Sequence, residues 1–251
     1  MADSLGSRML FGVIVPSTNT AVQPEYDDMR PNGVTNHISR AIIPDNPVVD
    51  EDTFLQMVKD IHNSTDEAIR AVMTCSPDHL ILGMSLETFW DGAEEAKKLH
   101  QHLEEVAGVG VTMASTACQA ALEILDGHDK IKKIACITPY LPIGDKNVHR
   151  FFEDIGYDVK VVNGLKCRGP RLIAHEQPEA LRQACLKVDS DDVDAIIQCG
   201  TNLAFAHVAP TVEKELGKPV IAINIATYWH ALRNTGIQDK FDGFGPLLAI
   251  H

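Results

Sequence analysis

The residue of this sequence best suited to chemistry is Cys199, which lies between the apolar run Ala195-Ile-Ile-Gln198 and Gly200. A thiol has an ordinary pKa of about 8.5, and backbone amides at a helix start would lower that pKa. A cysteine in such a setting can accept or deliver a proton, or attack carbon. The competing interpretation is a small buried residue after a strand, which is the role of most free thiols.

Several other short polar loops follow apolar runs, and they supply neutral hydrogen-bonding groups. None of these loops contains Lys, Arg, Asp or His, which argues against a metal centre, a Schiff base or a histidine-assisted triad unless distant residues reach in. One thiol among neutral donors suits a carboxylate whose charge spreads as an enolate forms. The candidate donors are the backbone around Met84, Ser85 and Gly200, and the hydroxyls of Ser85 and Tyr140. The loops are Pro16-Ser-Thr-Asn-Thr20, Gly83-Met-Ser-Leu86, Ser115-Thr116, Pro139-Tyr140, Cys199-Gly-Thr-Asn202 and Asn224.

The elements that must position these loops alternate between short apolar runs and amphipathic stretches, which is typical of βα units around a parallel sheet. The apolar runs predict strands over residues 11–15, 34–43, 79–82, 110–113, 134–138, 158–162, 195–198 and 220–223. The amphipathic stretches predict helices over residues 52–75, 90–106, 116–125, 143–155, 178–187, 209–216 and 226–235.

An internal repeat divides the chain into two related halves. Three segments recur in the same order: 12–17 resembles 135–140, 79–85 resembles 195–201, and 110–117 resembles 219–226. The repeat predicts an α/β fold of two similar doubly wound parallel-sheet sub-domains related by a pseudo-two-fold axis, with the active site in the cleft between them. The expected units are a first half of residues 1–125, a second half of residues 126–235 that contains Cys199, and a C-terminal segment of residues 236–251. The last helix of the first half is free to pack on the second half.

The composition of this 251-residue chain limits the kinds of partner that it is expected to bind. The 22 Lys and Arg against 35 Asp and Glu give a net charge of −13, which disfavours binding to nucleic acid or an anionic membrane. A small anion is still compatible, because a few oriented amides outweigh global repulsion locally. No apolar run is long enough to span a bilayer, so a cytoplasmic location is predicted. The six cysteines form no CxxC pair and the eleven histidines no HExxH pattern, so no metal is expected.

From Gly12 to about Gly236 the chain resembles arylmalonate decarboxylase and, slightly less closely, maleate cis-trans isomerase, both of the aspartate/glutamate racemase superfamily. The motifs that carry the resemblance are Gly83-Met-Ser-Leu-Glu-Thr-Phe-Trp-Asp-Gly92, Cys199-Gly200 and Tyr228-Trp-His-Ala-Leu-Arg233. The resemblance implies a cofactor-independent enzyme. In the racemases each half supplies one cysteine to opposite faces of the substrate α-carbon. In the decarboxylase glycine replaces the first cysteine, and the second protonates an enediolate.

The repeat pairs Cys199 with Gly83, so this chain has one proton-transferring thiol where the racemases have two. We therefore expect decarboxylation of a malonate-like dicarboxylic acid, a lyase reaction, with Cys199 as proton donor. Two departures keep an isomerase open. Met84 stands where the decarboxylase has a threonine, and Asn19 and Tyr140 match maleate isomerase residues, an asparagine that holds a substrate carboxylate and a tyrosine that acts with its cysteine. A racemase-like enzyme and a non-catalytic binding protein are further alternatives.

Each candidate residue also has a structural interpretation. Tyr140 could cap the sheet edge, Asn19 could hold its own turn, and Ser85 could be the N-cap of the helix that contains Trp90. The expected partner is a small carboxylate or dicarboxylate substrate, and a homodimer is left open. The expected site therefore comprises Cys199 and Tyr140 as catalytic residues and Asn19, Gly83, Met84, Ser85 and Gly200 as substrate-binding residues.

Overall fold

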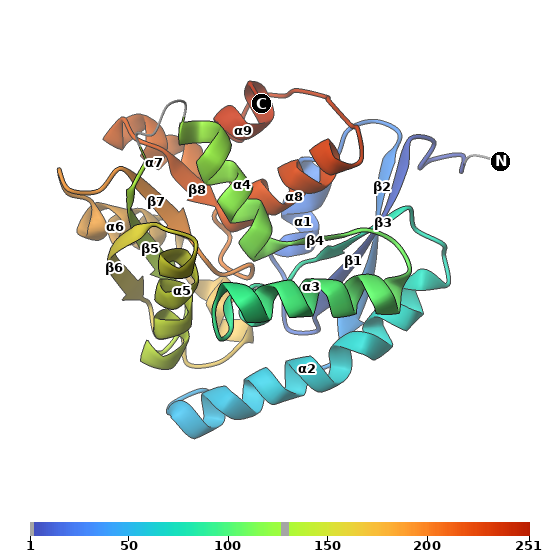
Figure 1. Ribbon diagram of the computed structural model, residues 1–251, viewed down its shortest axis with the longest axis horizontal. Coiled ribbons are helices and arrows are strands. Elements are labelled where there is room, and N and C mark those ends of the chain that lie inside the picture. The colour runs from blue at the N-terminus through green and yellow to red at the C-terminus, as the bar shows by residue number, and fades with distance from the viewer. Residues whose placement is uncertain (1–2, 127–130) are drawn as a thin grey trace.

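The computed structural model describes residues 3–126 and 131–251 and contains two parallel four-stranded sheets. In Figure 1 the first half (blue to green) lies mainly on the right and the second (yellow to red) mainly on the left. The first sheet has the order β2-β1-β3-β4 and the second the order β6-β5-β7-β8, so the predicted repetition of the α/β fold is confirmed. The strands are β1 Met9–Pro16, β2 Val34–Ala41, β3 His79–Leu82, β4 Val111–Met113, β5 Lys133–Thr138, β6 Asp158–Gly164, β7 Ala195–Gln198 and β8 Val220–Ala222.

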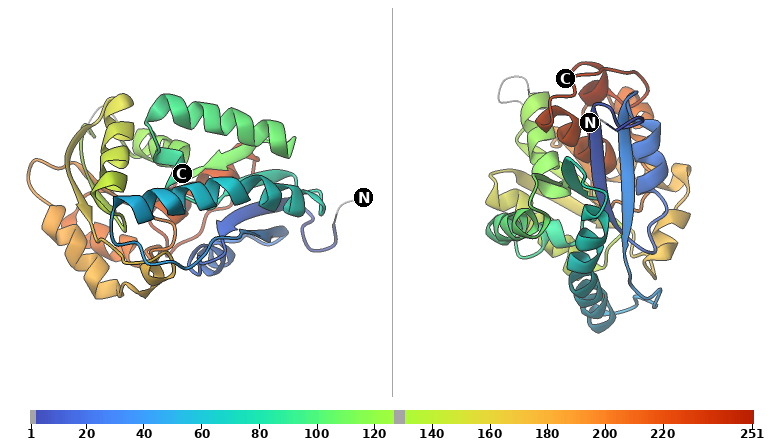
Figure 2. Two further views of the ribbon diagram at one scale, coloured as in Figure 1. Left: turned by 90° about the horizontal axis from the view of Figure 1, so that it is seen from below. Right: turned by 90° about the vertical axis from the view of Figure 1, so that its right-hand side faces the viewer.

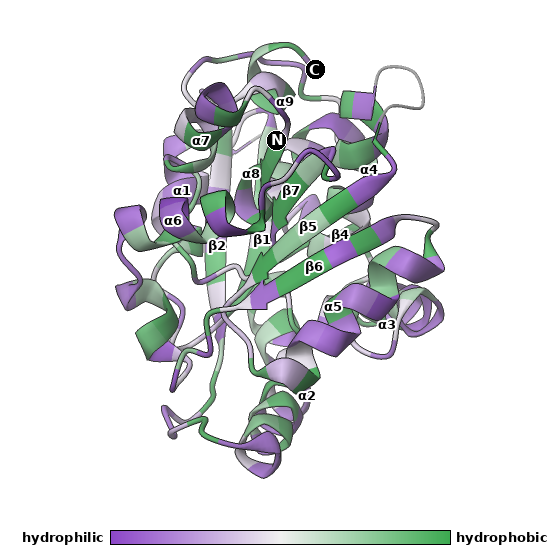
Figure 3. Cartoon of the chain, turned by 90° about the vertical axis from the view of Figure 1, so that its left-hand side faces the viewer, coloured by the Kyte–Doolittle hydropathy of each residue, from purple (hydrophilic) through white to green (hydrophobic). Residues whose placement is uncertain are grey.

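All eight predicted strands are present, with shifts only at their ends. The central strands are apolar along their length because helices cover both faces of each sheet. Residues 11–15 of β1 are fully or almost fully buried, as is all of β7. The edge strand β6 is exposed at several positions, and Figure 3 shows it alternating between hydrophilic and hydrophobic residues while β5 is largely hydrophobic.

The seven predicted helices are also present, and two short helices and two 3-10 turns are added to them. The predicted helix start at Trp90 is wrong, because Gly92 has a φ of 86° and the helix begins after it. The helices are α1 Val22–Asp28, α2 Glu51–Met73, α3 Ala93–Ala107, α4 Ala114–Asp126, α5 Pro142–Asp154, α6 Pro178–Val188, α7 Ala209–Leu216, α8 Ile223–Asn234 and α9 Pro246–Ala249, with 3-10 turns η1 Glu87–Phe89 and η2 Arg171–His175.

The long helix α2 belongs to the first half and contacts the second half. Its first turn is fixed by a capping box, in which Asp50 accepts from the Thr53 amide at 2.9 Å and the Thr53 hydroxyl accepts from the Asp50 amide at 3.1 Å. Figure 2 shows α2 running beside α3 and beyond the first sheet. The Phe54 ring there meets the Tyr140 ring of the second half edge-on, with centroids 6.0 Å apart.

Helices α4 and α8, which follow the last strand of each half, pack against one another in the middle of the molecule (Figure 1). Helix α8 also packs on β3 and β4 of the first sheet, so the second half contributes a helix to the first. Nine of its twelve residues are buried, because it has protein on nearly all sides. The domain limits 1–125, 126–235 and 236–251 stay a prediction.

Candidate active site

The backbone places Gly83 and Cys199 at equivalent points of the two sheets. Gly83 directly follows β3, and its amide donates to the carbonyl of Ile14 in β1 at 2.7 Å. Cys199 directly follows β7, and its amide donates to the carbonyl of Ile137 in β5, also at 2.7 Å. The equivalence inferred from the sequence repeat therefore holds in the hydrogen-bonded register.

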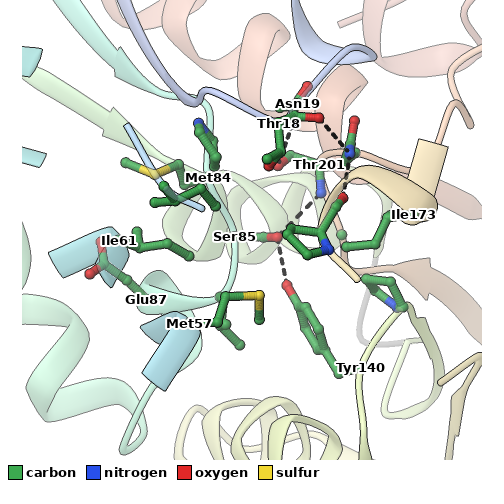
Figure 4. Close-up of a pocket in the computed structure, with 17 residues that line it drawn as sticks. Thr18, Asn19, Met57, Ile61, Met84, Ser85, Glu87, Tyr140, Ile173 and Thr201 are labelled. Atoms are coloured by element: carbon green, nitrogen blue, oxygen red, sulfur yellow. Dashed lines mark hydrogen bonds between the residues drawn. The ribbon is translucent and has the colours of Figure 1, made fainter. Parts of the chain in front are cut away.

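The loops at these strand ends from both halves enclose a cavity with about 490 Å³ of empty space, open solvent included (Figure 4). Its wall is largely apolar, with a polar region where the two halves meet. The first half contributes Pro16, Thr18, Asn19, Ile43, Met57, Ile61, Met84, Ser85, Leu86 and Glu87, and the second half Pro139, Tyr140, Pro170, Ile173, Gly200, Thr201 and Asn202.

A hydrogen-bond network joins the halves across this polar region (Figure 4). The hydroxyls of Ser85 and Tyr140 lie 2.7 Å apart and share a hydrogen bond. The Thr201 amide donates to Ser85 Oγ at 3.2 Å, and Asn19 Nδ2 donates to Thr201 Oγ1 at 3.4 Å. Among the described residues, the amides of Met84 and Gly200 donate to no protein group, so they are available to an anionic ligand.

Asn19 holds its own turn, as its sequence context suggested, and it also lines the cavity. Its Oδ1 accepts from the amides of Ala21 and Val22, each at 3.0 Å, and so fixes the turn that leads into α1. The same side chain directs its Nδ2 to the cavity wall. The expectation that Ser85 caps a helix is wrong, because its hydroxyl bonds Tyr140 and η1 has no side-chain cap.

Tyr140 is held in place from two sides. Its amide donates to Thr138 Oγ1 at 3.0 Å, and its ring packs on Phe54. Burial raises the pKa of the Tyr140 phenol well above its ordinary value, although the hydrogen bond with Ser85 opposes the shift. Tyr140 is therefore a neutral hydrogen-bonding group at physiological pH.

Cys199 is fully buried, and its environment differs from the one expected. Burial first, and the neighbouring Cys136 thiol second, raise the pKa of the Cys199 thiol well above its ordinary value. No helix start lowers that pKa, since α7 begins only at Ala209. Cys199 is thus a neutral thiol in this structure.

The structure brings most predicted site residues to the cavity, but not all of them. Asn19, Met84, Ser85, Tyr140 and Gly200 line it, whereas Cys199 and Gly83, their neighbours in the chain, do not. A side chain at position 83 would be crowded, because its Cβ would lie 2.7 Å from Val15 Cγ1 and 3.0 Å from the Ile14 carbonyl.

Several lining residues were not predicted from the sequence. Met57 and Ile61 come from α2, and Ile173 comes from η2. Glu87 belongs to the motif of residues 83–92 that carries the family resemblance, and this motif was the one sequence signal that could have indicated a role for Glu87. The loop after β2 contributes Ile43 and contacts the second half through Asp45, which accepts from Arg171 Nε at 2.8 Å.

Within residues 3–126 and 131–251, no group of three or more His, Cys, Asp or Glu is arranged to hold a metal ion. In that same part of the chain, no helix is long and apolar enough to cross a membrane.

The two parallel sheets have equivalent strand orders, and a cavity lies where their strand-end loops face one another. These features define an α/β protein of the Asp/Glu racemase-like fold. The family model described as arylmalonate decarboxylase matches residues 11–248, and the chain belongs to that family.

Relatives with two different activities are similar to this chain. The maleate isomerase of Pseudomonas putida is 24% identical over 247 residues, covering 95% of this chain and 96% of the relative. The arylmalonate decarboxylase of Bordetella bronchiseptica is 27% identical over 173 residues, covering 66% and 69%.

Among solved structures, a cysteine-to-serine mutant of Nocardia farcinica maleate cis-trans isomerase with a covalently bound succinylcysteine intermediate superposes with a TM-score of 0.86 at 19% identity, covering 97% of this chain and 99% of that chain. An arylmalonate decarboxylase structure superposes with a TM-score of 0.72 at 22% identity, covering 95% and 98%. The comparisons support an enzyme family that contains decarboxylases and cis-trans isomerases.

Proposed function

We propose that this protein is a cofactor-independent decarboxylase of a malonate-like dicarboxylic acid, with Cys199 as the proton donor. The observation that carries the proposal is the glycine at position 83, the structural equivalent of Cys199. With a thiol at only one of these two equivalent positions, a proton can reach only one face of a substrate α-carbon.

In the proposed reaction the bond between the α-carbon and one carboxylate breaks, and carbon dioxide leaves. The electron pair of that bond passes into the remaining carboxylate, which becomes an enediolate. The S–H bond of Cys199 then breaks, its proton forms the new C–H bond, and the thiolate takes a proton from solvent. The raised pKa of Cys199 supports this role, because a donor must hold its proton until the enediolate exists.

The neutral donors around the cavity suit the developing charge. The unpaired amides of Met84 and Gly200, together with the hydroxyls of Ser85 and Tyr140, can donate to carboxylate oxygens without a fixed cation. Asn19 Nδ2 can donate to the carboxylate that remains, where the negative charge develops. Because Cys199 does not line the cavity whereas its neighbour Gly200 does, the proposal requires the wall around Gly200 to move when substrate enters.

The test is a panel of α-substituted malonates assayed for carbon dioxide release, with the Cys199→Ser variant alongside the wild type. Cys185→Ser, which alters another buried thiol on α6, is the matched control. We expect release by the wild type and the control and a loss of at least about a hundredfold in Cys199→Ser. The proposal fails if no malonate is decarboxylated by the folded wild type, or if Cys199→Ser retains full activity.

The second candidate function is cis-trans isomerisation of a maleate-like diacid. It is favoured by Asn19, whose Nδ2 lies on the cavity wall beside Thr201. The raised pKa of the Cys199 thiol counts against this reaction, because attack on carbon needs a thiolate. Gly83 also counts against it, because only one of the two equivalent positions has a thiol. Separate quantification of the cis and trans diacids by chromatography, alongside carbon dioxide release, distinguishes the two reactions.

A further inference from the structure

A second hollow lies outside the candidate active site and is lined by residues of α2, α3 and η1. Helices α2 and α3 are neighbours (Figures 1 and 2). The hollow has about 750 Å³ of empty space, open solvent included. Helix α2 contributes His62 and Asp66 to its wall, η1 contributes Glu87, and α3 contributes His102 with Leu99 and Leu103. We call this hollow the α2–α3 cleft.

Glu87 is the unusual group in this cleft. Only 8% of the residue is exposed, and its Oε2 is buried without a hydrogen-bond partner among the described residues. Burial, reinforced by the nearby Asp66, raises the pKa of Glu87 to about 7. Figure 4 shows the carboxylate turned away from Ser85 and Tyr140, beside Ile61. A buried carboxyl without a partner is costly, so this one is set up to gain from a donor that the protein itself does not supply.

The other charged groups of the cleft do not neutralise Glu87. His62 Nδ1 lies 3.8 Å from Glu87 Oε1, beyond hydrogen-bond distance, and its side chain is 72% exposed. Asp66 is paired elsewhere, with His102 at 3.1 Å and with Arg70 at 3.6 Å. The Glu87 carboxylate therefore lacks a positively charged hydrogen-bond donor within the cleft.

We propose that the α2–α3 cleft binds a small organic ammonium ion. Its N–H groups donate to the Glu87 carboxylate, and its carbon chain lies against Leu99 and Leu103. The described residues offer no cluster arranged to hold a metal ion, which favours an organic cation over a metal. Glu87 also belongs to the wall of the candidate active site, so the two cavities share this residue.

The experiment is a titration of the full chain with n-butylammonium chloride at about pH 8, with n-butanol as the uncharged control ligand. Calorimetry gives the affinity, and proton NMR follows the histidine ring signals. We expect saturable binding of the ammonium ion but not of the alcohol, with shifts in the signals of His62 and His102 and none in that of His207, which lies in the second half and pairs with Asp28 at 3.2 Å. The Glu87→Gln variant is expected to bind at least about tenfold more weakly.

The matched control is Glu94→Gln, which removes an exposed carboxylate on α3 and is expected to bind like the wild type. Absence of saturable binding to the folded wild type overturns the proposal, as does binding that leaves His62 and His102 unshifted. Equal affinities of the wild type and a folded Glu87→Gln also overturn it. If Glu87→Gln does not fold, the histidine shifts in the wild type decide the question alone.

Discussion

Glu25 should make the stability of this protein fall as pH rises, although most carboxylates act in the opposite sense. This side chain of α1 is only 6% exposed and lies where the halves meet. Its Oε1 accepts from the Ala206 amide at 2.9 Å, and its Oε2 accepts from Asn224 Nδ2 at 2.6 Å. Asn224 Nδ2 also donates to the Thr201 carbonyl at 2.9 Å. Through Asn224, Glu25 therefore supports the loop that contains Cys199 and Thr201.

The size of the effect follows from the pKa. Burial raises the pKa of Glu25 from 4.5 to about 7, since its hydrogen bonds offset only part of the desolvation. Between these values the folded state binds more protons than the unfolded state, so the free energy of unfolding decreases as pH increases. The full difference is about 3 kcal/mol, of which about 2 kcal/mol falls between roughly pH 5.5 and pH 8.

The assay is urea unfolding of the wild type and Glu25→Gln at those two pH values. Glutamine cannot ionise, so the variant should lose about 2 kcal/mol less than the wild type on going to the higher pH. Other buried carboxyls such as Glu87 contribute equally to both proteins and cancel in the comparison. Glu105→Gln, at an exposed position of α3, should follow the wild type. Parallel pH dependences of the wild type and Glu25→Gln would refute the reasoning.

Three further changes test other parts of the structure. Tyr140→Phe removes the 2.7 Å hydrogen bond with Ser85 and should lower the free energy of unfolding by about 1 kcal/mol in urea titrations. Gly83→Cys should lower the free energy of unfolding by about 1–3 kcal/mol, because its Cβ crowds Val15, and Val15→Ala should restore part of the loss in urea titrations. Asp50→Ala should lower the thermal midpoint measured by circular dichroism, since the cap of α2 contributes about 1 kcal/mol.

The sequence predicted the sheets and the pairing of Gly83 with Cys199 because both depend on local order along the chain. Each strand is an apolar run of its own, and a repeated run of strands fixes which loops face one another. Helix α1 was not predicted, since it has only seven residues, contains Pro24 and has no side-chain cap. Such a segment forms through its tertiary contacts, and these have no signature in a short window of sequence.

The buried carboxyls show the same limit at the site. Glu25 meets Ala206 and Asn224, which are far from it in sequence, and nothing around Glu25 indicates that it is buried. The sequence offered the burial of Cys199 only as the competing interpretation, because burial depends on how distant segments of the chain pack around the thiol. The expected low pKa came from a helix start that the structure places ten residues further on, at Ala209.

That burial changes what Cys199 is suited to do. A thiol that attacks carbon must first lose its proton, and a dry environment next to Cys136 opposes that loss. A thiol that protonates an enediolate must keep its proton until the intermediate forms, and the same environment favours this. The enediolate is a far stronger base than a thiolate, so transfer to it stays favourable even when the pKa of the thiol is raised. Burial disfavours attack on carbon by Cys199, and the glycine at position 83 removes a second proton-transferring thiol, so these two independent features together favour a single proton donor.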